Sequence, residues 1–557
     1  MKFRSLSSQQ PAAALWATFF LAWITAIAVA SDGYKTFPGY GDYVRPITTE
    51  SAEAQKLFDQ GIQLMYGFNH DEAIRSFQAA AEADPAAAMP WWGIAYSHGV
   101  NINDSEMNDE RSKLAREAAD NALARIEGAT PEEAALIRAI SERYEYPAPE
   151  DRRPLDEAFA TAMEKAYANF PNDPEAGTIY GDSLMNLQPW DYWDSEGNPR
   201  GRINEIVSAL EHVMSYMPDH PGANHFYIHA VEASQHPDRA IAAADRMRSL
   251  VPGSGHLVHM PSHIYIRVGR YSDAVDSNFS AIEADRTYFK LAPKPKFYLV
   301  YYAHNQHFLA YAAMMSGRYG DAIKVARELE AEMPKDNLSE LAGIIEGIMP
   351  TTFHVLIRFG KWEQVLKEPA YAEDRLVSNA VRHYARSIAY SATGRTKEAR
   401  KELESFETAM AAVPEEWYVF NNPVSNVLPI AEAMIHGELL YREGKHDEAF
   451  AILRKGIEAE DSLVYDEPPG WMLPVRHALG ALLMEQGRYE EAEAVYREDI
   501  VLNRHNGWGL LGLQNALLAQ GKHPEAAPYA KKLEEVWKDA DTNPTSSCFC
   551  APMTASR

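Results

Sequence analysis

The sequence EAQKLFDQGIQLMYGFNHDEAIRSFQAAAEADP (residues 53–85) describes two helices and the turn that joins them. Apolar residues recur at helical spacing on both sides of Gly67. Pro85 ends the second helix, because proline lacks the amide proton that the interior of a helix requires. Two small residues, Gly61 and Ala73, stand where the helices must approach each other closely. This stretch therefore predicts a helical hairpin.

The same plan returns six times along the chain. Each copy has a Gly-x-x turn, a helix start, a small alanine and then apolar residues at helical spacing. The copies are GRYSDAVDSNFSAIEAD (269–285), GRYGDAIKVARELEAEMP (317–334), GRTKEARKELESF (394–406), GKHDEAFAILRKGIEAED (444–461), GRYEEAEAVYREDIVLN (487–503) and GKHPEAAPYAKKLEEVW (521–537). Repeats of this kind bury their apolar faces only by stacking on their neighbours. We therefore predict an all-α fold, an α-solenoid over residues 49–540.

These segments resemble tetratricopeptide repeats, whose two-helix unit has small, apolar and proline residues at the same intervals. The fullest match lies in residues 53–85, with Gly61, Ala73, Phe77, Ala80 and Pro85. The resemblance implies a right-handed α-solenoid whose first helices line a concave groove. It is specific for the fold and almost silent on function.

The net charge of the chain limits the kinds of partner that we expect it to bind. The 557 residues carry a formal net charge of −26, with no basic block outside the first few residues. A nucleic acid or an anionic membrane would be recognised through such a block. We therefore expect no nucleic-acid partner, and favour cations, small molecules or peptides.

The first thirty residues have the composition of a signal peptide. Lys2 and Arg4 precede the apolar run AAALWATFFLAWITAIAV (12–29), and Ala28-Val29-Ala30 provides the small residues that a signal peptidase requires. We predict a signal peptide at 1–30, an extended segment at 31–48 and export to the periplasm or the extracellular space. Membrane attachment would follow only if this segment is not cleaved.

The chain has two cysteines, Cys548 and Cys550, both in a polar C-terminal tail expected at 541–557. The exported body is therefore held together by packing rather than by a disulfide framework. The pair could bind a soft metal or oxidise, and its position in a tail leaves its role open.

Ten of the nineteen histidines lie between His212 and His307. The repeat register relates seven of them, together with Tyr311, to the small alanine of the second helix, at Ala240, Ala274 and Ala322. Positions fifteen residues before these alanines hold His225, His259 and His307; positions eleven before hold His229, His263 and Tyr311; and two positions eighteen before hold His256 and His304. Spacings of three and four residues place them on one helix face. The resemblance implies that this face lines the groove.

Neutral imidazoles that converge from neighbouring helices are ligands for transition metals. We therefore predict that the seven histidines at 225, 229, 256, 259, 263, 304 and 307 bind a divalent transition metal, either zinc, copper or iron. Glu232 lies three residues after His229 and could be a ligand, could orient an imidazole, or could act as a catalytic base toward metal-bound water. Asp182 follows the small Gly181 of the preceding unit and is a further groove candidate.

Tyr311, His354 and His477 are also groove candidates, although the last two are dispersed and ordinary packing is the better interpretation for them. The segment VYDEPPGWMLPVRHALG (464–480) has the same two interpretations. The insertion LQPWDYWDSEGNPRGR (187–202) could form a lid or aromatic wall over the groove, or an ordinary surface loop. We expect His220 and His236 to be turn residues and His212 to serve packing or the surface.

The sequence contains no glycine-rich phosphate loop, no G-x-S-x-G elbow and no H-E-x-x-H helix. Metal handling or metal-dependent catalysis is therefore the leading hypothesis, and a scaffold that binds a peptide or partner protein without metal is the alternative. The whole chain also resembles a group of exported bacterial tetratricopeptide proteins with segments close to HPGANHFYIHAVE, GHLVHMPSHIYIRVGRY and YDEPPGWMLPVR. That resemblance implies the fold and export, and no activity.

Export has a direct test. If Ala28-Val29-Ala30 is a cleavage site, protein recovered from the native host should begin at Ser31 and lie outside the cytoplasm. Amino-terminal sequencing of the cell fractions measures this. An intact amino terminus in the membrane fraction would contradict the prediction.

Overall fold

The computed structural model describes residues 34–292, 297–333 and 341–549. The predicted signal peptide at 1–30 and Cys550 lie outside the described residues. All that follows concerns the compact unit Phe37–Arg557.

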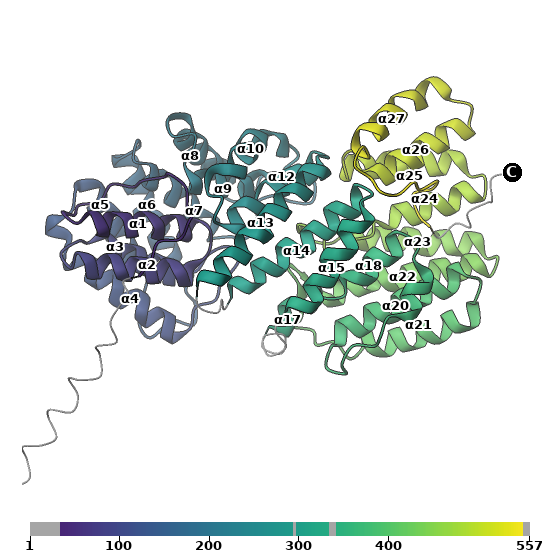
Figure 1. The fold of residues 1–557 in the computed structure, drawn as a ribbon, viewed down its shortest axis with the longest axis horizontal. Helices are drawn as coiled ribbons and strands as arrows, with labels where there is room; N and C mark the ends of the chain where they lie inside the picture. The colour runs from purple at the N-terminus through teal and green to yellow at the C-terminus, as the bar shows by residue number, and fades with distance from the viewer. Residues whose placement is uncertain (1–33, 293–296, 334–340, 550–557) are drawn as a thin grey trace, which may run out of the picture. The chain divides into compact units, whose positions relative to one another are not determined.

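The first part of this unit consists of helices packed against their sequence neighbours (Figure 1). They are α1 (Ala52–Tyr66), α2 (His70–Ala83), α3 (Met89–His98), α4 (Asp109–Leu123), η1 (Ile126–Gly128), α5 (Pro131–Ser141), α6 (Arg153–Asn169), α7 (Pro174–Met185), α8 (Ile203–Tyr216), α9 (Pro221–Val231), η2 (Pro237–Ala240), α10 (Ile241–Leu250), α11 (Gly255–His259), α12 (Pro261–Arg267) and α13 (Tyr271–Leu291).

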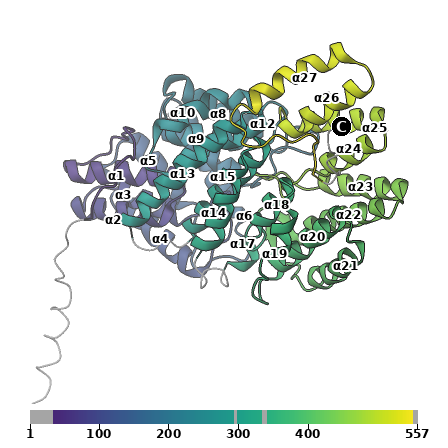
Figure 2. The ribbon, with the colours of Figure 1, turned by 45° about the vertical axis from the view of Figure 1, so that its right-hand side comes forward.

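The second part continues the same plan (Figure 2). Its elements are α14 (Tyr298–Met315), α15 (Tyr319–Glu332), α17 (Ala342–Ile345), α18 (Thr351–Arg358), α19 (Trp362–Lys367), α20 (Leu376–Ala392), α21 (Thr396–Met410), β1 (Tyr418–Val419), β2 (Asn422–Pro423), α22 (Val424–Arg442), α23 (His446–Asp461), α24 (Val475–Glu485), α25 (Tyr489–Leu502), α26 (Gly507–Ala519) and α27 (His523–Val536). Within the described ranges, the antiparallel pair β1–β2 is the only sheet. The predicted all-α helical-repeat solenoid is confirmed.

Glycines bring neighbouring helices together around aromatic rings. The ring of Phe77 on α2 lies between α1 and α3, and a β-carbon added at Gly61 or Gly93 would approach it to 2.5 or 2.7 Å. Tyr496 on α25 is held in the same way between α24 and α26, next to Gly480 and Gly512. These contacts explain why each repeat has a small residue in its first helix. They also explain the bulky residue that follows four positions after the small alanine of the second helix.

The turns between paired helices also follow the pattern. The first glycine of each of the six later copies has a left-handed backbone, for example Gly317 with φ +74° and Gly487 with φ +69°. In the first copy the left-handed residue is Phe68, with φ 54°, rather than Gly67. This shift turns the Phe68 ring toward the histidine-rich helices.

One predicted helix is divided. The histidine-rich stretch 255–267 forms two short helices, α11 and α12, that meet at Met260 and Pro261. Pro261 has no amide proton to donate, so the hydrogen-bond ladder is interrupted there. His263 consequently lies on a separate helix from His256 and His259.

Both ends of the described chain pack onto the helices. In the extended segment, Arg45 forms ion pairs with Asp173 at 2.7 Å and with Glu175 at 2.9 Å. At the other end, in the region predicted as a tail, Asp541 accepts hydrogen bonds from two backbone amides at the start of α15, and Ser547 is buried.

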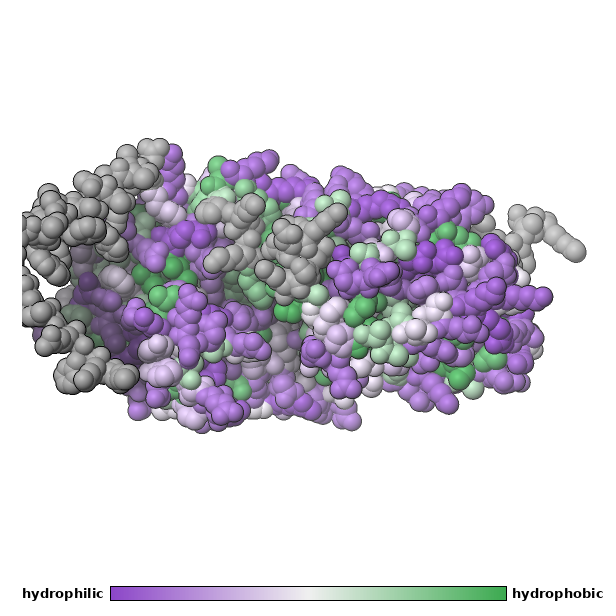
Figure 3. Space-filling view, turned by 90° about the horizontal axis from the view of Figure 1, so that it is seen from below, coloured by the Kyte–Doolittle hydropathy of each residue, from purple (hydrophilic) through white to green (hydrophobic). Residues whose placement is uncertain are grey.

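Hydrophilic side chains predominate on the face drawn in Figure 3, and apolar ones form small scattered groups. Among the helices of the described ranges, none is long and apolar enough to cross a membrane.

The glycine contacts predict the effect of a methyl group. Gly61→Ala gains about 1 kcal/mol of helix propensity, but its β-carbon would meet a ring that Gly93 blocks on the other side. Overpacking costs about 1–3 kcal/mol, so we expect a net loss of stability. Gly128→Ala is the control, because no atom lies within 4 Å of the added carbon. Urea unfolding followed by circular dichroism measures the stability of both variants. Equal unfolding midpoints for Gly61→Ala and Gly128→Ala would contradict the prediction.

Candidate metal centre

Four helices bring six histidines together. His225 and His229 lie on α9, His256 and His259 on α11, His263 on α12 and His304 on α14. Helix α9 contacts α12, and α11 contacts both α12 and α14. All six side chains are buried except that of His304, which is partly exposed. Histidines at equivalent positions of the repeats therefore lie close together in space.

The six form two groups of three. The first trio, defined as His225, His229 and His256, has one ring nitrogen of each residue within 4.8 Å of the others. The second trio, defined as His259, His263 and His304, meets the same limit. Its Nε2 atoms are close together: His259 lies 2.8 Å from His263 and 3.0 Å from His304.

Oxygen atoms around the trios fix the protonation of the rings. Nδ1 of His225 lies 2.7 Å from the backbone carbonyl of Tyr66, and Nδ1 of His259 lies 2.7 Å from Oδ1 of Asn278. The amide nitrogen of Asn278 donates to Ser262 Oγ and to the carbonyl of Ala274, so its oxygen faces His259. Because both oxygens only accept, each Nδ1 carries the proton and each Nε2 is a lone pair.

Glu232 connects the two trios. One of its oxygens lies 2.9 Å from Nδ1 of His229, and the other lies 2.6 Å from Nδ1 of His263. Burial favours the neutral acid, but the two histidines outweigh it and lower the pKa of Glu232 to about 2. The carboxylate is therefore ionised, and both Nδ1 atoms donate to it.

The Nε2 atoms of the second trio face one another. Nε2 of His259 and Nε2 of His263 are 2.8 Å apart. Burial, with the neighbouring imidazoles, lowers the pKa of four cluster histidines, namely His225, His256, His259 and His304, so an added proton is disfavoured. A transition-metal ion is the group that accepts several imidazole lone pairs at once.

Aromatic side chains close the cluster. The Trp190 ring, from the insertion at 187–202, lies 5.2 Å from that of His229. Phe420, between β1 and β2, lies 5.2 Å from His304, and Phe68 lies 5.2 Å from His256. The insertion thus contributes an aromatic wall to the first trio.

The remaining groove candidates lie outside the trios. Nδ1 of His307 is buried without a hydrogen bond, and its ring lies 5.7 Å from Phe420. Asp182 accepts hydrogen bonds from Tyr96 and Asn186. His354 packs against Trp471, with ring centroids 5.2 Å apart.

His477, His220, His212 and His236 also lie outside the trios. His477 lies 3.0 Å from Asp499. His220 caps α9 by accepting from the amide of Ala223, while His212 and His236 are exposed.

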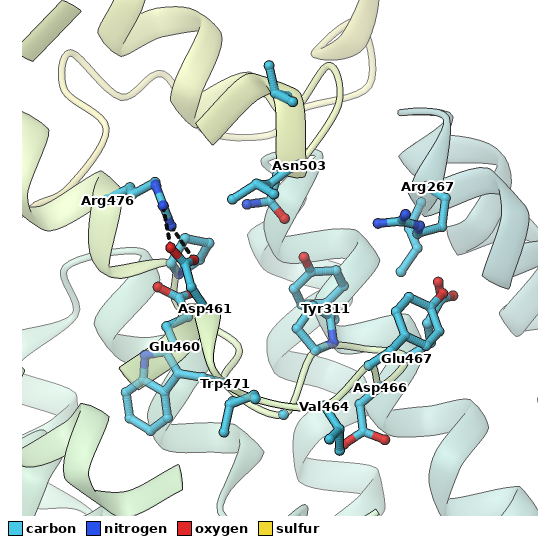
Figure 4. A pocket seen from close by; sticks show the side chains of 18 of the residues that line it. Arg267, Tyr311, Glu460, Asp461, Val464, Asp466, Glu467, Trp471, Arg476 and Asn503 are labelled. Carbon is cyan, nitrogen blue, oxygen red and sulfur yellow. Dashed lines mark hydrogen bonds and ion pairs between the residues drawn. The ribbon is translucent and has the colours of Figure 1, made fainter. Parts of the chain in front are cut away.

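A cavity of about 610 Å³ is lined by Glu467, among other residues (Figure 4). We call it the Glu467 cavity. Arg267 and Glu467 lie on one side of it, the ion pair of Asp461 and Arg476 lies opposite, and Tyr311 lies between. The Glu467 carboxylate is 3.6 Å from Nδ1 of His263, and its oxygens form no hydrogen bond. Burial, then the charge of Glu232, raises its pKa well above the usual range.

Glu467 has no place in the repeat register, because it comes from a loop that precedes α24. The sequence showed only an acidic pair before two prolines.

A second cavity has a volume of about 860 Å³. We call it the Phe68 cavity. Phe68 and Tyr301 line it, and the ring of Tyr301 also lies 4.8 Å from that of His256. Its wall includes four acidic side chains: Asp71, Asp104, Glu106 and Glu110.

Comparison with known proteins addresses the fold. Residues 475–507 match the tetratricopeptide repeat family. No curated protein matches the chain. The structure of the human IFIT1 dimer with m7Gppp-AAAA aligns with 89% of this chain and 91% of that chain, at 12% identity and a TM-score of 0.31. The APC/C hetero-tetramer Cut9-Hcn1 aligns with 88% of this chain and 76% of that chain, at 10% identity and a TM-score of 0.28. The chain is an all-α helical-repeat protein with a tetratricopeptide repeat at 475–507.

Proposed function

We propose that this is an exported bacterial tetratricopeptide protein that binds a transition metal, zinc, copper or iron, through its buried histidine cluster. The observation that carries the proposal is the 2.8 Å contact between Nε2 of His259 and Nε2 of His263. Asn278 and Glu232 hold both rings at Nδ1 so that their Nε2 atoms face each other. Two imidazole nitrogens held this close can bind the same metal ion.

Burial disfavours the peptide-scaffold alternative for these histidines. The exposed fraction of His225 and His259 is 0%, and that of His263 is 3%. A peptide in a groove could not reach their ring nitrogens without displacing Trp190, Phe420 or Phe68. The repeats can still bind a protein partner on other faces, independently of the metal.

The Glu467 cavity favours metal-dependent chemistry on a small molecule over simple metal storage. Its volume falls within the range of about 300–1,000 Å³ that is typical of small-molecule sites, and its wall combines two arginines, tyrosines and carboxylates. Glu232 has both oxygens engaged by histidines. It therefore acts as a positioning residue rather than as a base toward water.

Replacing a cluster histidine should lower the metal affinity more than replacing a turn histidine. Loss of an outer-shell partner alone lowers metal affinity about 10–100-fold, so His259→Ala should lower it at least as much, and His236→Ala should leave it unchanged. Elemental analysis after dialysis against a chelator, with circular dichroism to verify folding, measures this. Equal metal content in the two variants would contradict metal binding by the cluster.

Glu232→Gln tests the positioning role. The amide oxygen can accept from one histidine, but the amide nitrogen cannot accept from the other, so one ring loses its orientation. We expect a decrease in zinc affinity of about 10–100-fold. Glu211→Gln is the matched control, since Glu211 is a half-exposed acceptor for Tyr227 and Arg239. Unchanged zinc affinity in Glu232→Gln would refute this role.

A further inference from the structure

We infer that the cluster binds two metal ions side by side, one in each histidine trio. This inference rests on the proposed metal binding and adds its stoichiometry. The reason is that the ring nitrogens form two separate groups of three histidines, and within each group they lie within 4.8 Å of one another.

In the first trio, His225 presents a lone pair at Nε2 because its Nδ1 donates to Tyr66. His256 can satisfy it, since the two Nε2 atoms are 3.1 Å apart and the proton of His256 can lie between them. His229 then remains. Its Nδ1 donates to Glu232, and its Nε2 is buried without any hydrogen bond. The first trio therefore lacks one donor.

In the second trio, the proton of His304 can lie on Nε2 and satisfy His259 at 3.0 Å. Nε2 of His263 lies 2.8 Å from the same His259 nitrogen. The second trio therefore directs three ring nitrogens at one place, separately from the first.

A single central ion would not use both trios. The one group that spans the trios among the described residues is His229, Glu232 and His263. An ion there would use the Nδ1 atoms, which already have good hydrogen bonds to Glu232 at 2.9 and 2.6 Å. It would leave the Nε2 atoms of both trios unused. Two ions, bound through Nε2, use both trios and preserve both bonds to Glu232.

The trios are close enough to form one centre. The ring centroids of His229 and His263 are 5.5 Å apart, and those of His256 and His259 are 6.1 Å apart. The Glu232 carboxylate lies beside His263 and offsets part of the charge of the cations. Two-metal sites hold an oxygen-containing substrate or water between their ions. Glu467, which lies 3.6 Å from His263, lines a cavity of a size that fits a small molecule.

The full-length mature protein can be tested without any substitution. Copper(II) is added in steps to metal-free protein, and the bound copper and the electron paramagnetic resonance spectrum are recorded. We expect saturation at two ions per chain and a loss or broadening of the isolated-copper signal as the second ion binds, because the two spins lie close together. Saturation at one ion would overturn the inference while leaving metal binding intact, and no binding at all would overturn both.

Two variants assign the ions to the trios. His256→Gln should lower the zinc stoichiometry from two to one by removing a ligand of the first trio, and His304→Gln should do the same for the second. The double variant should bind none, and His236→Gln should bind two. If either single variant abolished both ions while retaining the helical circular dichroism of the wild type, a single shared site would replace the two-ion centre.

Discussion

Close approach of neighbouring helices at glycine is the constraint on which the rest of the structure depends. Where Gly61 and Gly93 enclose Phe77, and where Gly480 and Gly512 enclose Tyr496, the helices are fixed in register because a ring fills the space that a side chain would need. Each repeat then places equivalent positions of its first helix beside those of its neighbours. Histidines three or four residues apart on α9, α11, α12 and α14 meet because the repeats hold these helices at a constant offset, and they come from positions as far apart as 225 and 304.

The repeat register could therefore predict much of the centre. It predicted that His225, His229, His256, His259, His263 and His304 lie on one face of neighbouring helices, and in the structure their rings lie close together. It could not distinguish His307 from them, since His307 lies three residues after His304 and turns toward Phe420 instead. It also could not divide six histidines into two trios, because that division depends on the break at Pro261 and on the acceptors Tyr66 and Asn278, which come from α1 and α13.

The residues that the register missed lie where the repeats depart from their own pattern. Four non-glycine residues in the described ranges have a left-handed backbone: Phe68, Trp190, Phe420 and His505. Three of them contact cluster histidines. Such a conformation costs about 1–3 kcal/mol per residue and persists only where the surroundings enforce it. No repeat pattern specifies these positions, because each belongs to a turn or loop that interrupts the repeat.

The sequence meets two separate requirements. The glycine contacts and the turn glycines specify the solenoid, and they are compatible with any surface. Other features depart from the regular packing of the repeats, and the fold itself does not need them. They are the aromatic residues with a left-handed backbone, the helix divided at Met260 and Pro261, and the buried Glu467. They share one location, the histidine cluster, where they surround imidazole nitrogens that face one another. The regular repeat does not require this arrangement, and that is the reason to propose that the imidazoles bind metal ions.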